Sequence, residues 1–265
     1  MIFAGIDVGS LTAKAVIFED GKIAGKSIIK TKAAPQESGE EVMRLALEDA
    51  CIKMDDITYM VSTGYGKDRI PIADNSQSEI ACHARGAWWL APSTRTVIDI
   101  GGKDTRAIRV DNVGNVITHR YNDTCATGTG LVLDVMTKVL EAESNEMGMT
   151  LKESIKNLNL SNQLTGFYET EVVKMINGGK TVSDIIHRLS RTVSLHVAAL
   201  ARSIGIEDEV VITGGVAKNR SVSSALKQNL PSKLTTLNGF DPQLTGALGA
   251  ALYAQEKFSE MKNAS

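Results

Sequence analysis

GIDVGS, at residues 5–10, has the form of an apolar strand that closes on an aspartate and turns at once on a glycine. A glycine at such a turn lets backbone N–H groups approach phosphate oxygens without a Cβ in the way. The pattern returns as DIGGKD at residues 99–104, after a second apolar run. The interval between Asp7 and Asp99 is too long for a solenoid repeat and fits a duplicated α/β domain. The sequence therefore predicts an α/β protein in which two duplicated lobes face one another across a cleft.

Periodicity and turn residues outline the two lobes. Lobe I, residues 1–94, is expected to begin with strands around an Asp20-Gly21 hairpin turn. Its helices are expected over residues 39–54 and over SEIACHARGAWWLA. Lobe II, residues 95–245, is expected to contain strands at 95–100, 105–110, 116–121 and 209–213 and helices near 129–142, 167–177, 181–204 and 219–230. A last helix starts near residue 243, and its part from about 246 to 265 is expected to pack back onto lobe I.

The composition excludes several classes of protein. Among 265 residues, 29 Lys and Arg face 31 Asp and Glu, so no basic excess indicates nucleic acid as the main partner. The start MIFAGIDVGS lacks a signal-peptide pattern, and no apolar run approaches the length of a membrane span. The three cysteines, at 51, 82 and 125, fit neither a disulfide framework nor a CxxC zinc site. We expect a cytoplasmic protein.

Gly-containing turns at strand ends are the candidate phosphate-binding elements. The first turn offers amide, hydroxyl and ammonium donors beside a carboxylate, in Asp7, Gly9, Ser10, Thr12 and Lys14. The second contains Asp99, Gly101, Gly102, Lys103 and Asp104. The third, TGGVAKN at 213–219, follows the apolar run EVVIT, and Gly246 opens the last helix. Each turn alone is weak evidence, but together they predict nucleotide binding, with a carboxylate holding Mg²⁺ through water.

The sequence resembles the BadF/BadG/BcrA/BcrD ATPase family, and within it the activators of 2-hydroxyacyl-CoA dehydratases. The motifs run in order through nearly the whole chain: GIDVGSLTAK, STGYGK, SEIACHARGA, TVIDIGGKD, NDTCATGTGLVLDVM, FYETEV, VVITGGVAKN and LTGALGAALYA. The resemblance implies an actin-like ATPase fold, shared with Hsp70 chaperones and sugar kinases. It also implies a homodimer that binds ATP or ADP with Mg²⁺ and a [4Fe-4S] cluster between its subunits. ATP then drives transfer of a low-potential electron, taken from a ferredoxin or flavodoxin, to an acyl-CoA dehydratase or reductase.

The resemblance also implies roles for individual residues. Asp7 and Asp99 would lie near Mg²⁺ and the attacking water. Phosphate contacts would fall on Gly9, Ser10, Lys14, Gly101, Gly102 and Asp104, and adenosine contacts on Gly214, Gly215 and Asn219. One position departs from the family, because Lys103 replaces a glutamine. A lysine there either contacts phosphate as an added charge or faces solvent.

The cysteine set departs further from the family. The resemblance makes Cys125, in NDTCATGTG, a cluster ligand at the N-terminus of a helix, where a thiolate is favoured. The second family ligand aligns with Leu164, so two chains would bring two thiolates to a cluster that takes four. Three arrangements remain open: a heterodimer with a related, cysteine-bearing ATPase subunit, a cluster with other ligands, or an ATP switch without a cluster. The other candidate ligands are Asn162, Gln163, Tyr168 and Glu169.

Cys51 and Cys82 are expected to be small core residues, and His83, His187 and His196 to be surface or packing residues rather than ligands.

A small-molecule kinase of the same superfamily is the rival function. Such a kinase needs a carboxylate base beside an acceptor hydroxyl, and Asp7, Asp99 or Asp104 would supply it.

Overall fold

The structure, a computed structural model, describes residues 1–121, 174–230, 233–235, 237 and 239–264. Its described strands form two five-stranded sheets, in the orders β3-β2-β1-β4-β5 and β10-β9-β6-β7-β8. The first sheet contains β1 (Ile2–Val8), β2 (Thr12–Glu19), β3 (Lys22–Lys30), β4 (Ile57–Thr63) and β5 (Asn75–Ser76). The second contains β6 (Thr96–Ile100), β7 (Thr105–Val110), β8 (Val116–Tyr121), β9 (Val210–Thr213) and β10 (Leu234–Thr235).

The two sheets repeat one topology. In the first, β1 pairs antiparallel with β2 and parallel with β4. In the second, β6 pairs antiparallel with β7 and parallel with β9. The central strand of each sheet is therefore the strand that ends in one of the two Asp-Gly motifs, and the predicted duplicated α/β fold is confirmed.

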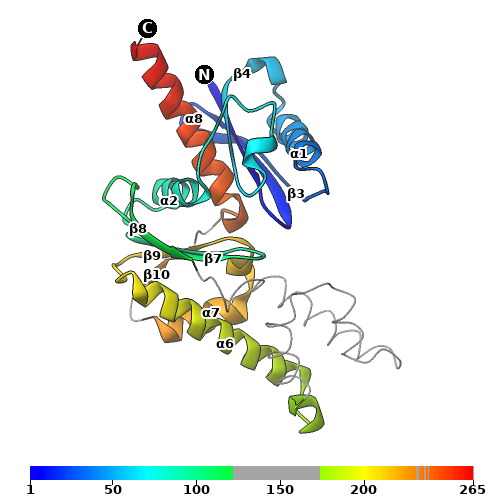
Figure 1. Cartoon of the computed structure of the whole chain (residues 1–265), viewed down its shortest axis with the longest axis vertical. Helices are drawn as coiled ribbons and strands as arrows, with labels where there is room; N and C mark the ends of the chain where they lie inside the picture. Colours follow the sequence, from blue (N-terminus) through cyan, green and yellow to red (C-terminus); the bar gives the residue numbers. More distant parts are fainter. Residues whose placement is uncertain (122–173, 231–232, 236, 238, 265) are drawn as a thin grey trace.

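The described helices cover the faces of both sheets (Figure 1). They are α1 (Pro35–Ala50), α2 (Glu79–Leu90), α6 (Val182–Ser203), α7 (Arg220–Asn229) and α8 (Thr245–Ala264). Short 3-10 helices are η1 (Met54–Asp56), η2 (Lys67–Arg69), η3 (Gly215–Lys218) and η4 (Pro242–Leu244). None of the described helices is long and apolar enough to cross a membrane.

Side chains along each central strand point alternately to the two faces of its sheet, and each face packs against different helices. On β1, Ala4 and Ile6 belong to the core under α1, whereas Phe3 packs with Ala250 and Ala254 of α8. On β6, Ile98 and Ile100 belong to the core that contains α6 and α7, whereas Val97 packs with α2. Helix α2 therefore packs against the second sheet and against α8, and α8 runs along one face of the first sheet (Figure 1).

The structure corrects one helix boundary and the burial of one cysteine. The helix expected over residues 39–54 begins at Pro35, which suits a first helical turn, and ends at Ala50. Cys51 therefore lies beyond the helix, in a left-handed conformation with φ 55°, and it is exposed rather than part of the core. Cys82 is buried as expected. The helices expected near 129–142 and over residues 167–173 lie outside the described residues.

Candidate functional site

A cavity of about 600 Å³ lies where the two Asp-Gly turns meet, a size that suits a small-molecule ligand. The predicted residues that line it are Asp7, Gly9, Ser10, Thr12, Lys14, Asp99, Gly101, Gly102, Lys103, Asp104, Gly214, Gly215 and Asn219. Gly246 lies behind this lining, because a Cβ there would come within 2.9 Å of both Asp7 Oδ2 and His83 Nε2. Turns that are far apart in the sequence thus converge on one site.

The duplication extends to single residues around Asp7. Lys14 pairs with Asp7 in the β1–β2 register, and its Nζ donates to Asp7 Oδ2 at 3.0 Å. Thr63 pairs with Asp7 on the parallel side. Gly64 follows with φ +91°, and a Cβ there would come into close contact with Asp7 Oδ1. Only a glycine at this position leaves the carboxylate its space.

The surroundings of Asp99 repeat this arrangement. Arg106 pairs with Asp99 in the β6–β7 register and donates from Nη1 to Oδ2 at 2.9 Å. Thr213 is the parallel partner, and its hydroxyl donates to Asp99 Oδ1 at 3.1 Å. Gly214 follows with φ +84°, and a Cβ there would lie 2.8 Å from the same oxygen. Each buried aspartate therefore has a cation, a threonine and a left-handed glycine in equivalent places.

The two aspartates differ in the hydrogen-bond partners of their carboxylate oxygens. Asp99 already accepts hydrogen bonds from two side chains. Asp7 Oδ1 is buried and has no hydrogen-bond partner among the described residues. A buried carboxylate oxygen without a partner is costly unless a ligand, a cation or water satisfies it. Asp7 thus fits the predicted Mg²⁺ role, since this metal is held by few carboxylates and keeps several waters.

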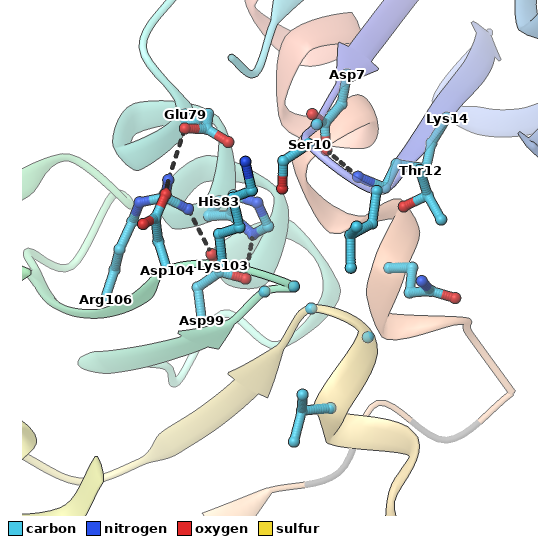
Figure 2. Close-up of a pocket in the computed structure, with 18 of the residues that line it drawn as sticks. Asp7, Ser10, Thr12, Lys14, Glu79, His83, Asp99, Lys103, Asp104 and Arg106 are labelled. Carbon is cyan, nitrogen blue, oxygen red and sulfur yellow. Dashed lines mark hydrogen bonds and ion pairs between the residues drawn. The ribbon is translucent and has the colours of Figure 1, made fainter. Parts of the chain in front are cut away.

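Two residues that the sequence analysis did not single out, Glu79 and Arg106, form the second half of the polar network (Figure 2). Arg106 Nη2 donates to Glu79 Oε2 at 2.7 Å and to Asp104 Oδ2 at 3.2 Å. Glu79 is the first residue of α2, whose N-terminus Ser78 caps by accepting from the Ala81 N–H. One buried guanidinium therefore joins α2, β6 and the turn that follows β6.

His83 is buried, in keeping with the expectation of a surface or packing residue, but it also lines the cavity. It lies one turn after Glu79 on α2 and is 5% exposed. Its Nδ1 is 3.0 Å from Thr213 Oγ1 and 3.4 Å from Asp99 Oδ1. Burial lowers the pKa of His83, so the ring is neutral near pH 7. The spacing of Glu79 and His83, which places both on one face of a helix, was the signal available in the sequence.

Burial and ion pairing set the charge states of the carboxylates in the cavity. Burial raises the pKa of Glu79 to about 7, although Arg106 acts in the opposite direction. Burial also disfavours the charged form of Asp99, but His83, the charge and hydrogen bond of Arg106 and the hydrogen bond from Thr213 together outweigh it and hold the pKa of Asp99 below its usual value. The lining holds four carboxylates, Asp7, Glu79, Asp99 and Asp104, and four cations, Lys14, Lys103, Arg106 and Lys218. A nucleotide would add the negative charge of its phosphates to this balanced lining, which favours a cation that enters with it.

The turn after β9 forms the opposite wall. Gly214 donates its N–H to the Pro242 carbonyl at 3.0 Å, and Gly215 lies against Gln243, a lining residue absent from the sequence predictions. The Asn219 side chain accepts hydrogen bonds from the N–H groups of Ser221 and Val222 and so caps α7. The predicted helix start after TGGVAKN is correct, and the Asn219 carboxamide oxygen is already engaged in the cap.

Comparison with known proteins identifies the family of this site. The sequence model of the BadF/BadG/BcrA/BcrD ATPase family matches residues 4–254. The chain belongs to this family. It is 41% identical over 256 residues to an activator of lactoyl-CoA dehydratase from Anaerotignum propionicum, covering 97% of this chain and 98% of that protein.

Solved structures of family members agree with the architecture. The (R)-2-hydroxyglutaryl-CoA dehydratase component A of Acidaminococcus fermentans superposes with a TM-score of 0.81 at 36% identity, covering 98% of this chain and 99% of that one. An activator of 2-hydroxyisocaproyl-CoA dehydratase from Clostridium difficile, solved with bound ADPNP, gives 0.83 at 32% identity, covering 100% and 98%. The fold is the actin-like ATPase fold, and the chain is an ATPase of this family.

The predicted cluster residues Cys125 and Leu164 lie outside the described residues. Cys82 is buried between α2 and α8, and burial raises the pKa of its thiol to about 12, so it does not offer a thiolate. Cys51 is exposed at the end of α1. Within the described ranges no group of three or more His, Cys, Asp or Glu side chains is arranged to hold a metal ion.

Proposed function

We propose that the chain is the ATP-dependent activator of an acyl-CoA dehydratase or reductase and couples ATP binding and hydrolysis to delivery of a low-potential electron. The observation that carries the proposal is the near full-length match to activators of 2-hydroxyacyl-CoA dehydratases, with 41% identity to one of them. The duplicated turns that meet at one cavity support the nucleotide half of this function.

ATP is proposed to bind with its phosphates on the turns at Gly9 and Gly101 and its adenosine beside Gly214 and Gly215. The unpartnered Asp7 oxygen supports a magnesium ion held through water on that side of the cavity. The ion would offset the charge of the phosphates. The chain's own residues orient the phosphates by backbone N–H groups at the two turns.

The nucleotide contacts both halves of the duplication and therefore links lobe I, residues 1–94 with the helix at about 246–265, to lobe II, residues 95–245. A change of nucleotide then alters the free energy of one lobe arrangement relative to another. Moving such an equilibrium from 1:99 to 99:1 takes about 5.5 kcal/mol of differential affinity. Phosphate contacts made from both lobes are a suitable source of that energy.

The cysteine set does not fit a [4Fe-4S] cluster made by two copies of this chain alone. Four thiolates are needed, and Cys125 is the one family ligand present, while Cys82 is buried in the core. We therefore propose a heterodimer with a related, cysteine-bearing ATPase subunit, reduced by a ferredoxin or flavodoxin. A homodimer with non-thiolate ligands and a cluster-free ATP switch are the alternatives.

Iron analysis of the chain purified without oxygen separates these arrangements. About two iron and two sulfide per chain, with a brown colour, would support a four-iron cluster shared by two copies and would overturn the heterodimer. A colourless, iron-free chain that still hydrolyses ATP supports the heterodimer if a related subunit restores both iron and electron transfer to a 2-hydroxyacyl-CoA dehydratase. Without that restoration, the cluster-free switch stands. ADP release that requires an added alcohol would instead indicate a kinase.

A further inference from the structure

Asp99, Arg106 and Tyr121 form a row of side chains across three neighbouring strands. Arg106 on β7 pairs in register with Asp99 on β6 and with Tyr121 on β8. Directly paired residues on neighbouring strands project from the same face of a sheet. The arginine therefore stands between a buried carboxylate of the phosphate site and the aromatic ring that ends β8.

The Arg106 guanidinium contacts both ends of this row. It donates to Asp99 at 2.9 Å, to Glu79 at 2.7 Å and to Asp104 at 3.2 Å. Its central carbon also lies 5.6 Å from the centroid of the Tyr121 ring, within the range of a cation–π contact. The Arg106 guanidinium thus contacts both the carboxylates of the cavity and the Tyr121 ring.

Tyr121 lies partly exposed at the end of β8 and is not a core residue. Its side chain is 45% exposed. Besides Arg106, the ring contacts His119, and the two ring centroids lie 5.5 Å apart in an edge-on arrangement. In the sequence, Tyr121 leads directly into NDTC, which ends at Cys125. Tyr121 therefore contacts a side chain of the phosphate site and, in the sequence, directly precedes the segment with the one cysteine matching a family cluster ligand.

We propose that Tyr121 is a positioning residue through which Arg106 conveys the nucleotide state of the cavity to the chain around Cys125. This inference rests on the ATP switch of the proposed function. ATP carries one phosphoryl group more than ADP, and phosphate oxygens compete with carboxylates for guanidinium donors. When a terminal phosphate changes how Arg106 is shared among Asp99, Asp104 and Glu79, the cation moves relative to the Tyr121 ring.

Hydrogen–deuterium exchange tests this coupling in the full chain, purified without oxygen with whatever centre it holds. Exchange of peptides that cover residues 122–135 is compared between the ADP and ADPNP complexes, both with Mg²⁺. The parent is expected to give different exchange rates in the two complexes. Tyr121→Leu is expected to reduce the ratio of these rates about two- to five-fold, the equivalent of one exposed cation–π contact.

Matched variants exclude simpler explanations. Tyr121→Phe keeps the ring face and is expected to keep the parent ratio, as is Ile117→Ala, which removes another exposed apolar side chain from β8. ADPNP affinity is expected to stay within about two-fold of the parent in all three, because a cation–π contact remote from the ligand adds little to binding.

Three results would overturn the inference. If Tyr121→Leu keeps the parent's difference in exchange rate between the ADP and ADPNP complexes, the inference is wrong and the proposed function is unaffected. Loss of the difference in Tyr121→Phe would show that the hydroxyl, not the ring face, is responsible. A parent that exchanges equally with ADP and ADPNP removes the inference together with the ATP switch.

Discussion

Replacing Glu79 by glutamine is expected to stabilise the fold above pH 7, although Glu79 makes an ion pair. Burial raises the pKa of this carboxyl from 4.5 to about 7. Each pKa unit corresponds to about 1.4 kcal/mol, so keeping Glu79 ionised in the folded chain costs about 3 kcal/mol. Between pH 4.5 and 7 the folded chain binds more protons at this site than the unfolded chain. Stability therefore falls as the pH rises through this window, and the full cost applies above it.

Glu79→Gln removes that cost and keeps a side chain able to accept from Arg106 Nη2. Arg106 is not left unpaired, because Asp99 and Asp104 still accept its hydrogen bonds. We expect urea unfolding at pH 8 to give a free energy of unfolding up to about 3 kcal/mol above that of the parent, and little gain at pH 5. ATP hydrolysis by the same variant is expected to fall, because a neutral amide holds Arg106 less strongly than a carboxylate and Arg106 also contacts Asp99 and Asp104.

The control is Glu48→Gln on the exposed face of α1, where Glu48 pairs with Arg44 at 2.5 Å. This surface pair is expected to contribute less than about 0.5 kcal/mol at either pH. Should Glu79→Gln destabilise the chain at pH 8 by 1 kcal/mol or more, or give the same change at pH 5 and pH 8, burial would not be the dominant influence on Glu79. A stability gain without any loss of hydrolysis would remove Glu79 from the functional residues.

Three further variants or treatments test the cavity. Lys103→Gln is expected to weaken ADPNP binding several-fold more than ADP binding in calorimetry, if its ammonium contacts the terminal phosphate, and equal effects would place Lys103 in solvent. Gly246→Ala brings a Cβ within 2.9 Å of Asp7 and His83 and should lower both stability, by about 1–3 kcal/mol, and nucleotide affinity. Its control, Gly21→Ala, also lowers stability because Gly21 has φ +79°, but its Cβ meets nothing within 4 Å and nucleotide affinity should stay unchanged. Chelation of Mg²⁺ is expected to weaken ADPNP binding at least about ten-fold, and unchanged affinity would contradict the role given to Asp7.

The repeated Asp-Gly turn predicted the fold because it marks the carboxyl end of each central strand. The strand alternation and hairpin turns around it are local patterns, so the order of elements could be derived from Asp7 and Asp99 outward. The bounds of α1 could not, because the helix begins at Pro35, four residues before the predicted start, and ends at Ala50, with Cys51 in a left-handed conformation beyond it. Helix boundaries depend on capping and on packing that the periodicity does not contain.

The phosphate turns were predictable for the same local reason, whereas their partners were not. Arg106 reaches the cavity only because the β6–β7 register sets it opposite Asp99, and a shift by one residue would turn it to the other face. Glu79 and His83 come from a helix whose placement depends on α8 and on the second sheet. Their spacing was visible, but the direction of that helix face is a tertiary property.

Two unfavourable terms in the cavity bear on how, under the proposed function, this chain can work with Leu164 in place of a family ligand. Asp7 has an unpartnered oxygen and Glu79 is ionised at a desolvation cost, so a metal and nucleotide that satisfy these groups stabilise the cavity. These terms arise from side chains that belong to the two sheets and α2, and none depends on the number of cysteines. In the proposed function, Leu164 would therefore leave the driving force of the nucleotide switch unchanged. It would change which partner has to supply the electron-carrying centre that the switch controls.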